Sequence, residues 1–279
     1  MLVGSAYHCR VQPATDTRNP GTPVVARVAL DASAEAWPLA RGEVQVWRAS
    51  LERPAATVER MRGVLAADER ERADRFRFER HRARYTVGRA LLRYMLARYV
   101  DSSPRDLELQ YGEFGKPELP GGPSFNLSHS HASALYAFGA SGEIGVDIEV
   151  YDPGFAGGRV AERFFSPAEV SVLRSLSAEL QPRAFLECWT RKEAFIKARG
   201  DGLSLALDSF DVTLAPDVPA ALVRTAWSEE EPARWQLEDL SDRQAGYVAA
   251  VAVGGGRCTV LEREIVDTTK GNVPGQERE

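Results

Sequence analysis

The feature that most constrains this chain is an uninterrupted helical stretch, Arg183–Arg199, which places a carboxylate among apolar side chains. The stretch contains neither Pro nor Gly, and Gly200 directly after it is a common helix terminator. At about 100° per residue, Glu193 lies within the apolar stripe of this helix. The stripe is formed by Phe185, Leu186, Trp189 and Ile196. A buried charge is costly unless a cation, a metal or hydrogen bonds compensate it, so the sequence predicts a partner for this carboxylate.

Two interpretations of Glu193 are open. Lys197 follows one turn later on the same side, and the two can form an ordinary helix pair worth a few tenths of a kcal/mol. Alternatively, a second acidic element converges on the helix. The alternation over residues 143–150 puts Asp147 and Glu149 on one face of a strand and the apolar side chains on the other. Three such carboxylates can hold magnesium, which takes oxygen ligands and substrate phosphates, whereas a solvated acidic strand face is the simpler alternative.

Composition restricts the class of protein. The 279 residues are 44% hydrophobic and 27% charged, which is typical of a soluble globular protein with one large or two ordinary domains. There is no run of 18 apolar residues and no basic segment followed by an apolar one at the N-terminus, so we expect neither membrane insertion nor secretion. The three cysteines are widely spaced and form neither a disulfide framework nor a zinc pattern, which favours a reducing cytoplasm.

Charge is unevenly distributed along the chain. The net charge of −5 argues against nucleic-acid binding. Residues 69–98 nevertheless contain ten Arg and four acidic residues, a local charge of +6. This stretch is therefore a candidate phosphate-facing surface.

The hydrophobic pattern predicts an α+β protein made of two similar halves. We expect an irregular N-terminal extension over residues 1–41, a first half over 42–150, a second half over 151–263 and a flexible tail over 264–279. Each half reads as helices followed by antiparallel strands, with the long helix packed on the sheet and a site at the seam. The predicted helices of the first half are 58–65, 66–77 and 81–100, and its strands are 42–49, 107–111, 124–131 and 134–140.

Two local predictions follow from the same pattern. We expect strands 134–140 and 144–150 to form a hairpin through residues 141–143. In the second half we expect helices at 159–165 and 183–199, and strands near 210–214, 235–240 and 247–253. Ser166 and Glu169 predict a capping box at the start of a further helix, with Pro167 at its first position.

The strand at 124–131 carries two of the four histidines among hydroxyl side chains. Neighbouring residues on a strand point to opposite faces, so Ser128 and His129 make a poor nucleophile–base pair. Phosphate binding by hydroxyl, imidazole and Lys116 fits this composition better, and a structural histidine is the alternative.

Five motifs, occurring in order over roughly residues 42–262, resemble those of the 4′-phosphopantetheinyl transferases of the double-length, surfactin synthetase-activating (Sfp-like) type. They are Phe114-Gly115-Lys116-Pro117, Phe125-Asn126-Leu127-Ser128-His129-Ser130, Gly145-Val146-Asp147-Ile148-Glu149, Phe164-Phe165-Ser166, and the segment from Trp189 to Ser204. The resemblance implies a monomer in which one chain forms a pseudo-dimer. It also implies holo-[acyl-carrier-protein] synthase activity. In that reaction the phosphopantetheine arm of coenzyme A, the co-substrate, moves to a serine of an acyl, peptidyl or aryl carrier domain, and 3′,5′-adenosine bisphosphate is released.

The resemblance also implies roles for individual residues. Asp147, Glu149 and Glu193 match the magnesium ligands, and Glu193 also matches the residue proposed in some members as the base for the carrier serine. Lys197 matches a lysine near the pyrophosphate, where it would stabilise the transferring group. The remaining coenzyme A contacts implied are Lys192, Lys116, Ser128 and His129 on phosphates, and Arg72 and Arg84 near the nucleotide end.

Two other functions are compatible with the same residues. A non-catalytic module would bind coenzyme A or a carrier domain, but it would be expected to have lost an acid or the lysine. A different magnesium-dependent phosphotransfer or phosphodiester enzyme could use the same carboxylates, although the sequence has neither a P-loop nor a kinase signature.

Overall fold

The fold is that of a computed structural model, which describes residues 26–29, 36–152, 154, 158–216 and 218–266. Most of the expected N-terminal extension and tail lies outside these residues. Within the extension, strand β1 (Ala26–Ala29) pairs in parallel with β12 (Thr259–Val266), at positions we expected to be irregular. No helix among the described residues is long and apolar enough to cross a membrane.

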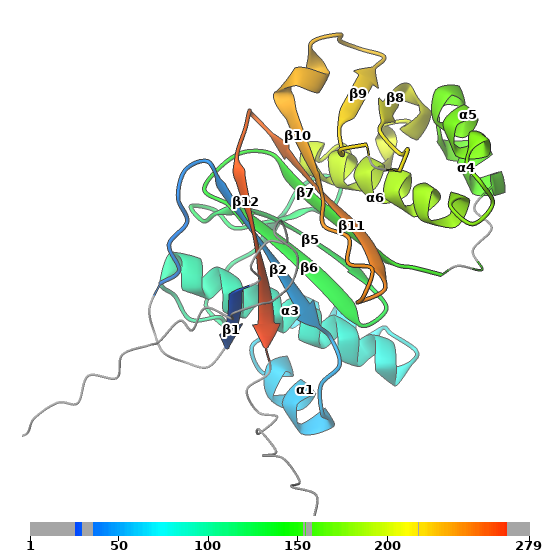
Figure 1. The fold of residues 1–279 in the computed structure, drawn as a ribbon. Coiled ribbons are helices and arrows are strands. Elements are labelled where there is room, and N and C mark those ends of the chain that lie inside the picture. The colour runs from blue at the N-terminus through cyan, green and yellow to red at the C-terminus, as the bar shows by residue number, and fades with distance from the viewer. Residues whose placement is uncertain (1–25, 30–35, 153, 155–157, 217, 267–279) are drawn as a thin grey trace, which may run out of the picture.

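The first half contains helices α1 to α3 and a sheet, of which Figure 1 labels α1 and α3. Its elements are β2 (Glu43–Ser50), α1 (Ala55–Arg62), α2 (Ala67–Asp74), α3 (Glu79–Val100), β3 (Gln110–Tyr111), β4 (Pro117–Glu118), β5 (Ser124–Ser130) and β6 (Ser133–Gly139). Strands β2, β6 and β5 are neighbours in that order, with β12 on the outer side of β2. Because β12 runs parallel to β2, this sheet is mixed and not purely antiparallel.

The second half repeats this order. It contains β7 (Ile144–Val150), α4 (Gly158–Phe164), α5 (Pro167–Ser175), α6 (Gln181–Arg199), β8 (Phe210–Val212), β9 (Leu222–Thr225), β10 (Trp235–Asp239) and β11 (Tyr247–Gly254). Short 3₁₀ turns occupy Gly202–Ser204, Leu207–Ser209 and Glu231–Arg234. The strand order β7-β11-β10 matches β2-β6-β5, and three helices follow the first strand in each half. The predicted α+β duplication is therefore confirmed, as is the capping box of α5.

The predicted hairpin between residues 134–140 and 144–150 is wrong. Strand β6 pairs with β2 and β5, while β7 pairs with β11 over residues 144–150 and 247–253. The loop between β6 and β7 is short, but Gly142 there adopts φ 106°, and the chain passes from one sheet to the other. The two apolar strands β7 and β11 bury each other, and this non-local pairing prevails over the local one.

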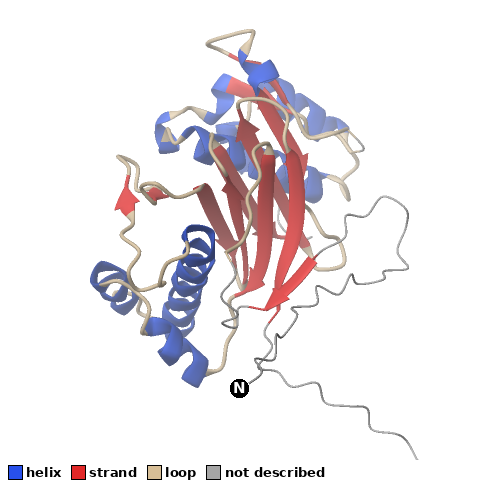
Figure 2. Cartoon of the chain, turned by 90° about the vertical axis from the view of Figure 1, so that its left-hand side faces the viewer, coloured by secondary structure: helices blue, strands red, loops and turns tan. Residues whose placement is uncertain are grey.

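The two sheets pack face to face between the two long helices. Figure 2 shows the strands in the middle of the molecule with helices at either end. An apolar cluster lies between the sheets and includes Val44, Val46, Ile144, Val146 and Ile148. Alternation then turns the remaining residues of β2 toward α3 and those of β7 toward α6. The predicted alternation of residues 143–150 is thus confirmed, and Asp147 and Glu149 face α6.

Candidate active site

The site lies where α6 packs on β7, and a glycine permits the contact. A Cβ atom added at Gly145 would lie 2.0 Å from the carbonyl oxygen of Ala194 and 2.3 Å from the amide nitrogen of Ala198. Any side chain there would push the helix away from the strand. Glycine therefore brings Glu193 and Lys197 of α6 close to the acidic face of β7.

The centre of the site is a charged pair with a hydroxyl. Lys197 Nζ donates to Asp147 Oδ1 at 2.5 Å and to Ser128 Oγ at 3.0 Å. The Ser128 hydroxyl in turn donates to Asp147 Oδ1 at 2.7 Å. Asp147 is only 3% exposed, and its other oxygen, Oδ2, is buried without a hydrogen-bond partner among the described residues. An unpaired carboxylate oxygen in such a place is costly unless a ligand satisfies it.

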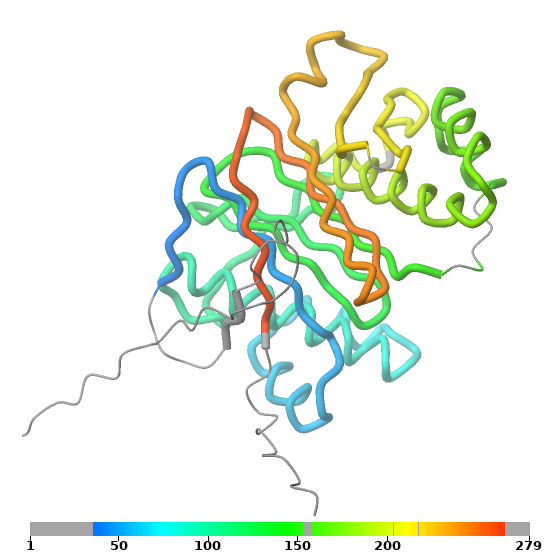
Figure 3. The backbone as a smooth tube through the Cα atoms, viewed as in Figure 1, coloured from blue at the N-terminus to red at the C-terminus, as the bar shows by residue number. Residues whose placement is uncertain are grey.

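Side chains of β5 join the two halves at this point. Ser130 Oγ donates to Glu149 Oε2 at 2.9 Å and accepts from the Val150 amide at 3.1 Å. Asn126 Oδ1 accepts from the Val146 amide at 3.0 Å. Strands β5 and β7 run side by side (Figure 3) without a backbone ladder, and every second side chain of β5 bridges the gap.

Glu193 completes the acidic cluster. Burial raises the pKa of its carboxyl against the opposing charge of Lys197, and the negative charges of Asp147 and Glu149 raise this pKa further. Burial likewise raises the pKa of Glu149, with Asp147 contributing and the Ser130 hydrogen bond opposing. The ammonium of Lys197 bonds to Asp147 and not to Glu193, so the simple helix pair considered from the sequence is not formed.

Metal-ligand geometry is not present in the cluster. Among the described residues, no group of three or more His, Cys, Asp or Glu side chains is arranged to hold an ion. The donor chemistry nevertheless fits a hard divalent cation. Three carboxylates repel one another here, and one buried oxygen of Asp147 is unpaired.

Two of the expected coenzyme A contacts lie beside this cluster. His129 is largely exposed, and partial burial of its ring, together with the positive charges of Lys197 and Arg84, lowers its pKa. Arg84 donates through Nε and Nη2 to Glu52 Oε1 at 2.9 and 2.7 Å. Arg72 is exposed on α2 and lies over the ring of Tyr85, 5.7 Å from its centroid.

Two lysines take positions that sequence reasoning did not anticipate. Lys192 is completely buried and bonds to Glu169 Oε2 at 2.8 Å and to the carbonyls of Leu207 and Phe210 at 2.7 and 2.5 Å. This placement does not support the expected phosphate contact. Lys116 Nζ also donates to backbone carbonyls, which belong to α6 and β7.

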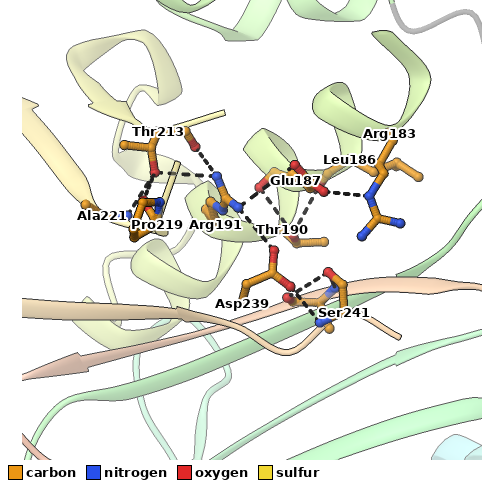
Figure 4. A network of polar contacts seen from close by, with 11 residues as sticks. Arg183, Leu186, Glu187, Thr190, Arg191, Thr213, Pro219, Ala221, Asp239 and Ser241 are labelled. Carbon is orange, nitrogen blue, oxygen red and sulfur yellow. Dashed lines mark hydrogen bonds and ion pairs between the residues drawn. The ribbon is translucent and has the colours of Figure 1, made fainter. Parts of the chain in front are cut away.

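A further polar network fixes α6 on its other side (Figure 4). Arg191 is two residues from Glu193, about 200° around the helix. Its guanidinium donates to the carbonyl of Thr213 at 2.6 Å and to Asp239 Oδ2 at 3.1 Å. Arg191, Ser130 and Gly145 position the site, and the sequence analysis assigned no role to any of them, although Ser130 and Gly145 lie in two of the quoted motifs. The spacing of Ser130 from Asn126 and Ser128 could have indicated its role, because it matches the alternation of the acids on β7.

Comparison with known proteins agrees with the motifs. The profile of the "4'-phosphopantetheinyl transferase superfamily" matches residues 143–252, and that of "4'-phosphopantetheinyl transferase, N-terminal" matches residues 45–142. The chain is 39% identical over 219 residues to the 4′-phosphopantetheinyl transferase HetI of Nostoc sp., covering 76% of this chain and 88% of that protein. It is 37% identical over 161 residues to Sfp of Bacillus subtilis, covering 57% of this chain and 70% of that protein.

Among solved structures, the ACPS–CoA complex of Chronobacterium ammoniagenes matches with a TM-score of 0.32 at 23% identity, over 42% of this chain and 99% of that chain. The two profiles together span both halves of the fold, and the boundary between them falls in the loop before β7. On the two profiles and the identity to HetI, this chain belongs to the 4′-phosphopantetheinyl transferase superfamily.

Proposed function

We propose that this protein transfers the 4′-phosphopantetheine moiety of coenzyme A to a serine of an acyl, peptidyl or aryl carrier domain. The reaction depends on magnesium and releases 3′,5′-adenosine bisphosphate, converting apo to holo carrier proteins. The observation that supports it best is the half-buried cluster of Asp147, Glu149 and Glu193 beside Lys197, in which Asp147 Oδ2 has no partner among the described residues. We further propose that it acts as a cytoplasmic monomer, because one chain supplies both halves.

The three carboxylates would hold the magnesium ion. When bound, the ion neutralises charge on the pyrophosphate oxygens of coenzyme A. Ser128 and Ser130 each donate a hydrogen bond to one oxygen of Asp147 or Glu149, and this fixes the orientation of both carboxylates. Asp147 Oδ2 then remains as a buried carboxylate oxygen without a hydrogen bond to the described residues, available to a metal ion.

In the transfer step the hydroxyl oxygen of the carrier serine attacks the phosphorus that bears the pantetheine arm. A new P–O bond forms, and the P–O bond to the bridging oxygen breaks, leaving 3′,5′-adenosine bisphosphate. Lys197 is partly exposed, and the longest of its three hydrogen bonds, to the Val146 carbonyl at 3.5 Å, would be replaced by one to a phosphoryl oxygen, where negative charge accumulates. Glu193 accepts the proton of the serine directly or through water.

The coenzyme A phosphates would lie along the β5 side of the cluster. The positive charges of Lys197 and Arg84 both act on His129 there. Two cations and the ring N–H of His129 beside an acidic cluster suit a metal-bound pyrophosphate with a further phosphate group. Arg72 would contact the nucleotide end from α2.

Intact-mass spectrometry of a panel of apo carrier domains tests the proposal. Each carrier is incubated with the protein, coenzyme A and magnesium, and a carrier lacking its acceptor serine serves as control. We expect the mass of one phosphopantetheine group to be added to at least one carrier and not to its serine-less variant. Coenzyme A binding without any transfer would favour a non-catalytic module, and breakdown of coenzyme A without an acceptor would favour a different phosphotransfer enzyme.

A further inference from the structure

Lys116 lies in the loop between β3 and β4 and reaches across to the second half. Its ammonium donates to three backbone carbonyls: Lys197 at 2.8 Å, Ile144 at 3.2 Å and Ala198 at 3.3 Å. An ammonium has three N–H bonds, and here each has an acceptor. A lysine saturated in this way has no donor left for a phosphate.

The three acceptors belong to the two elements that carry the acidic cluster. Lys197 and Ala198 are in the last turn of α6, where carbonyl groups lack partners within the helix and a cation is favoured. Ile144 begins β7, three residues before Asp147. The helix and the strand touch at Gly145, which is next to Ile144, so the ammonium lies where their relative position is set.

A second contact from the same loop supports this arrangement. Phe114 packs against the turn after α6, where a Cβ added at Gly202 would lie 3.0 Å from its ring. Both Gly200 and Gly202 adopt positive φ angles, 81° and 58°, so the chain turns sharply there. Phe114 and Lys116 therefore hold the C-terminal end of α6 from two sides.

The first half has a contact at the equivalent place. The amide of Trp37 donates to the carbonyl of Arg98 at 3.0 Å. Arg98 precedes the left-handed cap residue Asp101 by three positions, just as Lys197 precedes Gly200. In both halves, a segment from outside the helix thus bonds to the same carbonyl of its last turn.

We propose that Lys116 is a positioning residue for phosphopantetheine transfer and not a phosphate contact. It holds the end of α6 against β7, so that Lys197 and Glu193 face Asp147 and Glu149. This rests on the proposed function. Loss of the Lys116 hydrogen bonds shifts the groups that act in the transfer step and leaves the coenzyme A-binding groups on β5, α2 and α3 unchanged.

The test compares steady-state kinetics of K116M with those of wild type and of R159M, which removes an exposed cation from α4. We expect kcat per folded molecule to fall about tenfold to a hundredfold in K116M, because small misplacements of reacting groups cost rates of this order. The KM for coenzyme A stays within about twofold, as expected when ground-state binding is intact. K116R restores part of kcat, because its guanidinium also donates to carbonyls.

A second substrate separates positioning from phosphate binding. The ratio of kcat/KM for coenzyme A to that for 3′-dephospho-coenzyme A should be the same in K116M and wild type. A raised KM with unchanged kcat, or a loss of this preference, would show that Lys116 contacts phosphate and would overturn the proposal. If K116M does not fold, K116Q, which keeps two N–H donors, should also show a lowered kcat with a nearly unchanged KM for coenzyme A, to a smaller extent.

Hydrogen exchange gives a readout that does not depend on turnover. Amides of residues 198–204 should exchange faster in K116M than in wild type, while those at the end of α3 do not change. Unchanged exchange at the end of α6 would contradict the proposal that Lys116 holds this end of the helix against β7. A wild type that modifies no carrier would instead count against the proposed function, and the exchange result would still decide the role of Lys116.

Discussion

The two halves of the molecule share one framework but differ at the face that meets the long helix. Gly42 and Gly142 both have positive φ angles and precede strands of the same pattern. Counting from these glycines, Trp47 occupies the position of Asp147, and Ala49 that of Glu149. Trp47 is completely buried; its indole stacks on Trp37 at 4.3 Å and donates to Tyr99 Oη at 2.9 Å. The first half thus fills with aromatic rings the place where the second half gathers charge.

The buried ion pairs show the opposite tendency and are alike in the two halves. Glu69 of α2 bonds to Arg93 Nε at 2.6 Å, and Glu169 of α5 bonds to Lys192 Nζ at 2.8 Å. The two cations also donate to carbonyls just beyond their helices, those of Pro104 and Leu107 for Arg93 and of Leu207 and Phe210 for Lys192. The comparison teaches that these pairs belong to the shared fold, while the acids on β7 belong to function.

The largest effect is expected at the two equivalent strand positions. D147N should lower the rate of carrier modification by about a thousandfold, because several kcal/mol of charge stabilisation are lost with the metal ligand. W47F should leave the rate per folded molecule unchanged. Initial rates and thermal melts of both variants check this, and near-normal turnover in D147N would remove Asp147 from the mechanism.

The buried pairs should have the next largest effect, on stability. E69Q leaves Arg89 and Arg93 without their buried counter-charge and should lower the free energy of unfolding by about 3–5 kcal/mol. E169Q should cost a similar amount. Only E169Q should also lower turnover per folded molecule, since Lys192 belongs to the helix that carries Glu193. Denaturant melts combined with rates test this. Equal turnover per folded molecule in the two variants would contradict the assignment of the active site to the second half.

A smaller effect is expected from the segment before β2. W37A removes a half-buried indole that stacks on Trp47 and should cost about 2 kcal/mol of unfolding free energy. Turnover per folded molecule should not change, because this contact lies in the first half, away from the acidic cluster of Asp147, Glu149 and Glu193. A variant with normal stability and reduced turnover would show that the segment serves the active site.

The smallest effect concerns pH. Burial tends to raise the pKa of Glu69, but Arg89, the hydrogen bond from Arg93 and the Ala66 amide outweigh it and hold this pKa below the ordinary 4.5. A carboxyl with a lowered folded-state pKa stabilises the fold above its unfolded value and loses this contribution as pH falls through the folded value. The stability gap between wild type and E69Q should therefore be constant above about pH 5 and shrink below pH 4.5. A stability gap that widens on acidification would contradict a lowered pKa of Glu69 in the folded protein.

Much of the fold could be predicted from local patterns. The limits of α6 and the faces of β7 follow from periodicity, and the capping box of Ser166 and Glu169 follows from chemistry that acts within one turn. The pairing of β7 with β11 and the parallel strand β12 were missed, because they join residues about 100 and 200 positions apart in the chain. No local pattern encodes such partners.

The site residues likewise fall into those that local patterns reveal and those that depend on partners from distant parts of the chain. Glu193 was found because charge on an apolar helix face is unusual, and Asp147 and Glu149 were found because alternation puts both on one face of a strand. Lys197 was found because of its spacing from Glu193. The position of Lys192 could not be found in this way, since its partner Glu169 and the carbonyl of Phe210 come from other elements. A conspicuous lysine next to an acid can serve the core as well as a ligand.

The most direct test is a calorimetric titration of magnesium into the protein with coenzyme A present, carried out on wild type, D147N and W47F. We expect one ion per chain in wild type and W47F and no measurable binding in D147N, because D147N removes a carboxylate of the acidic cluster and W47F leaves the cluster intact. Binding of wild-type strength in D147N, or two ions per chain, would contradict a single magnesium site in the second half.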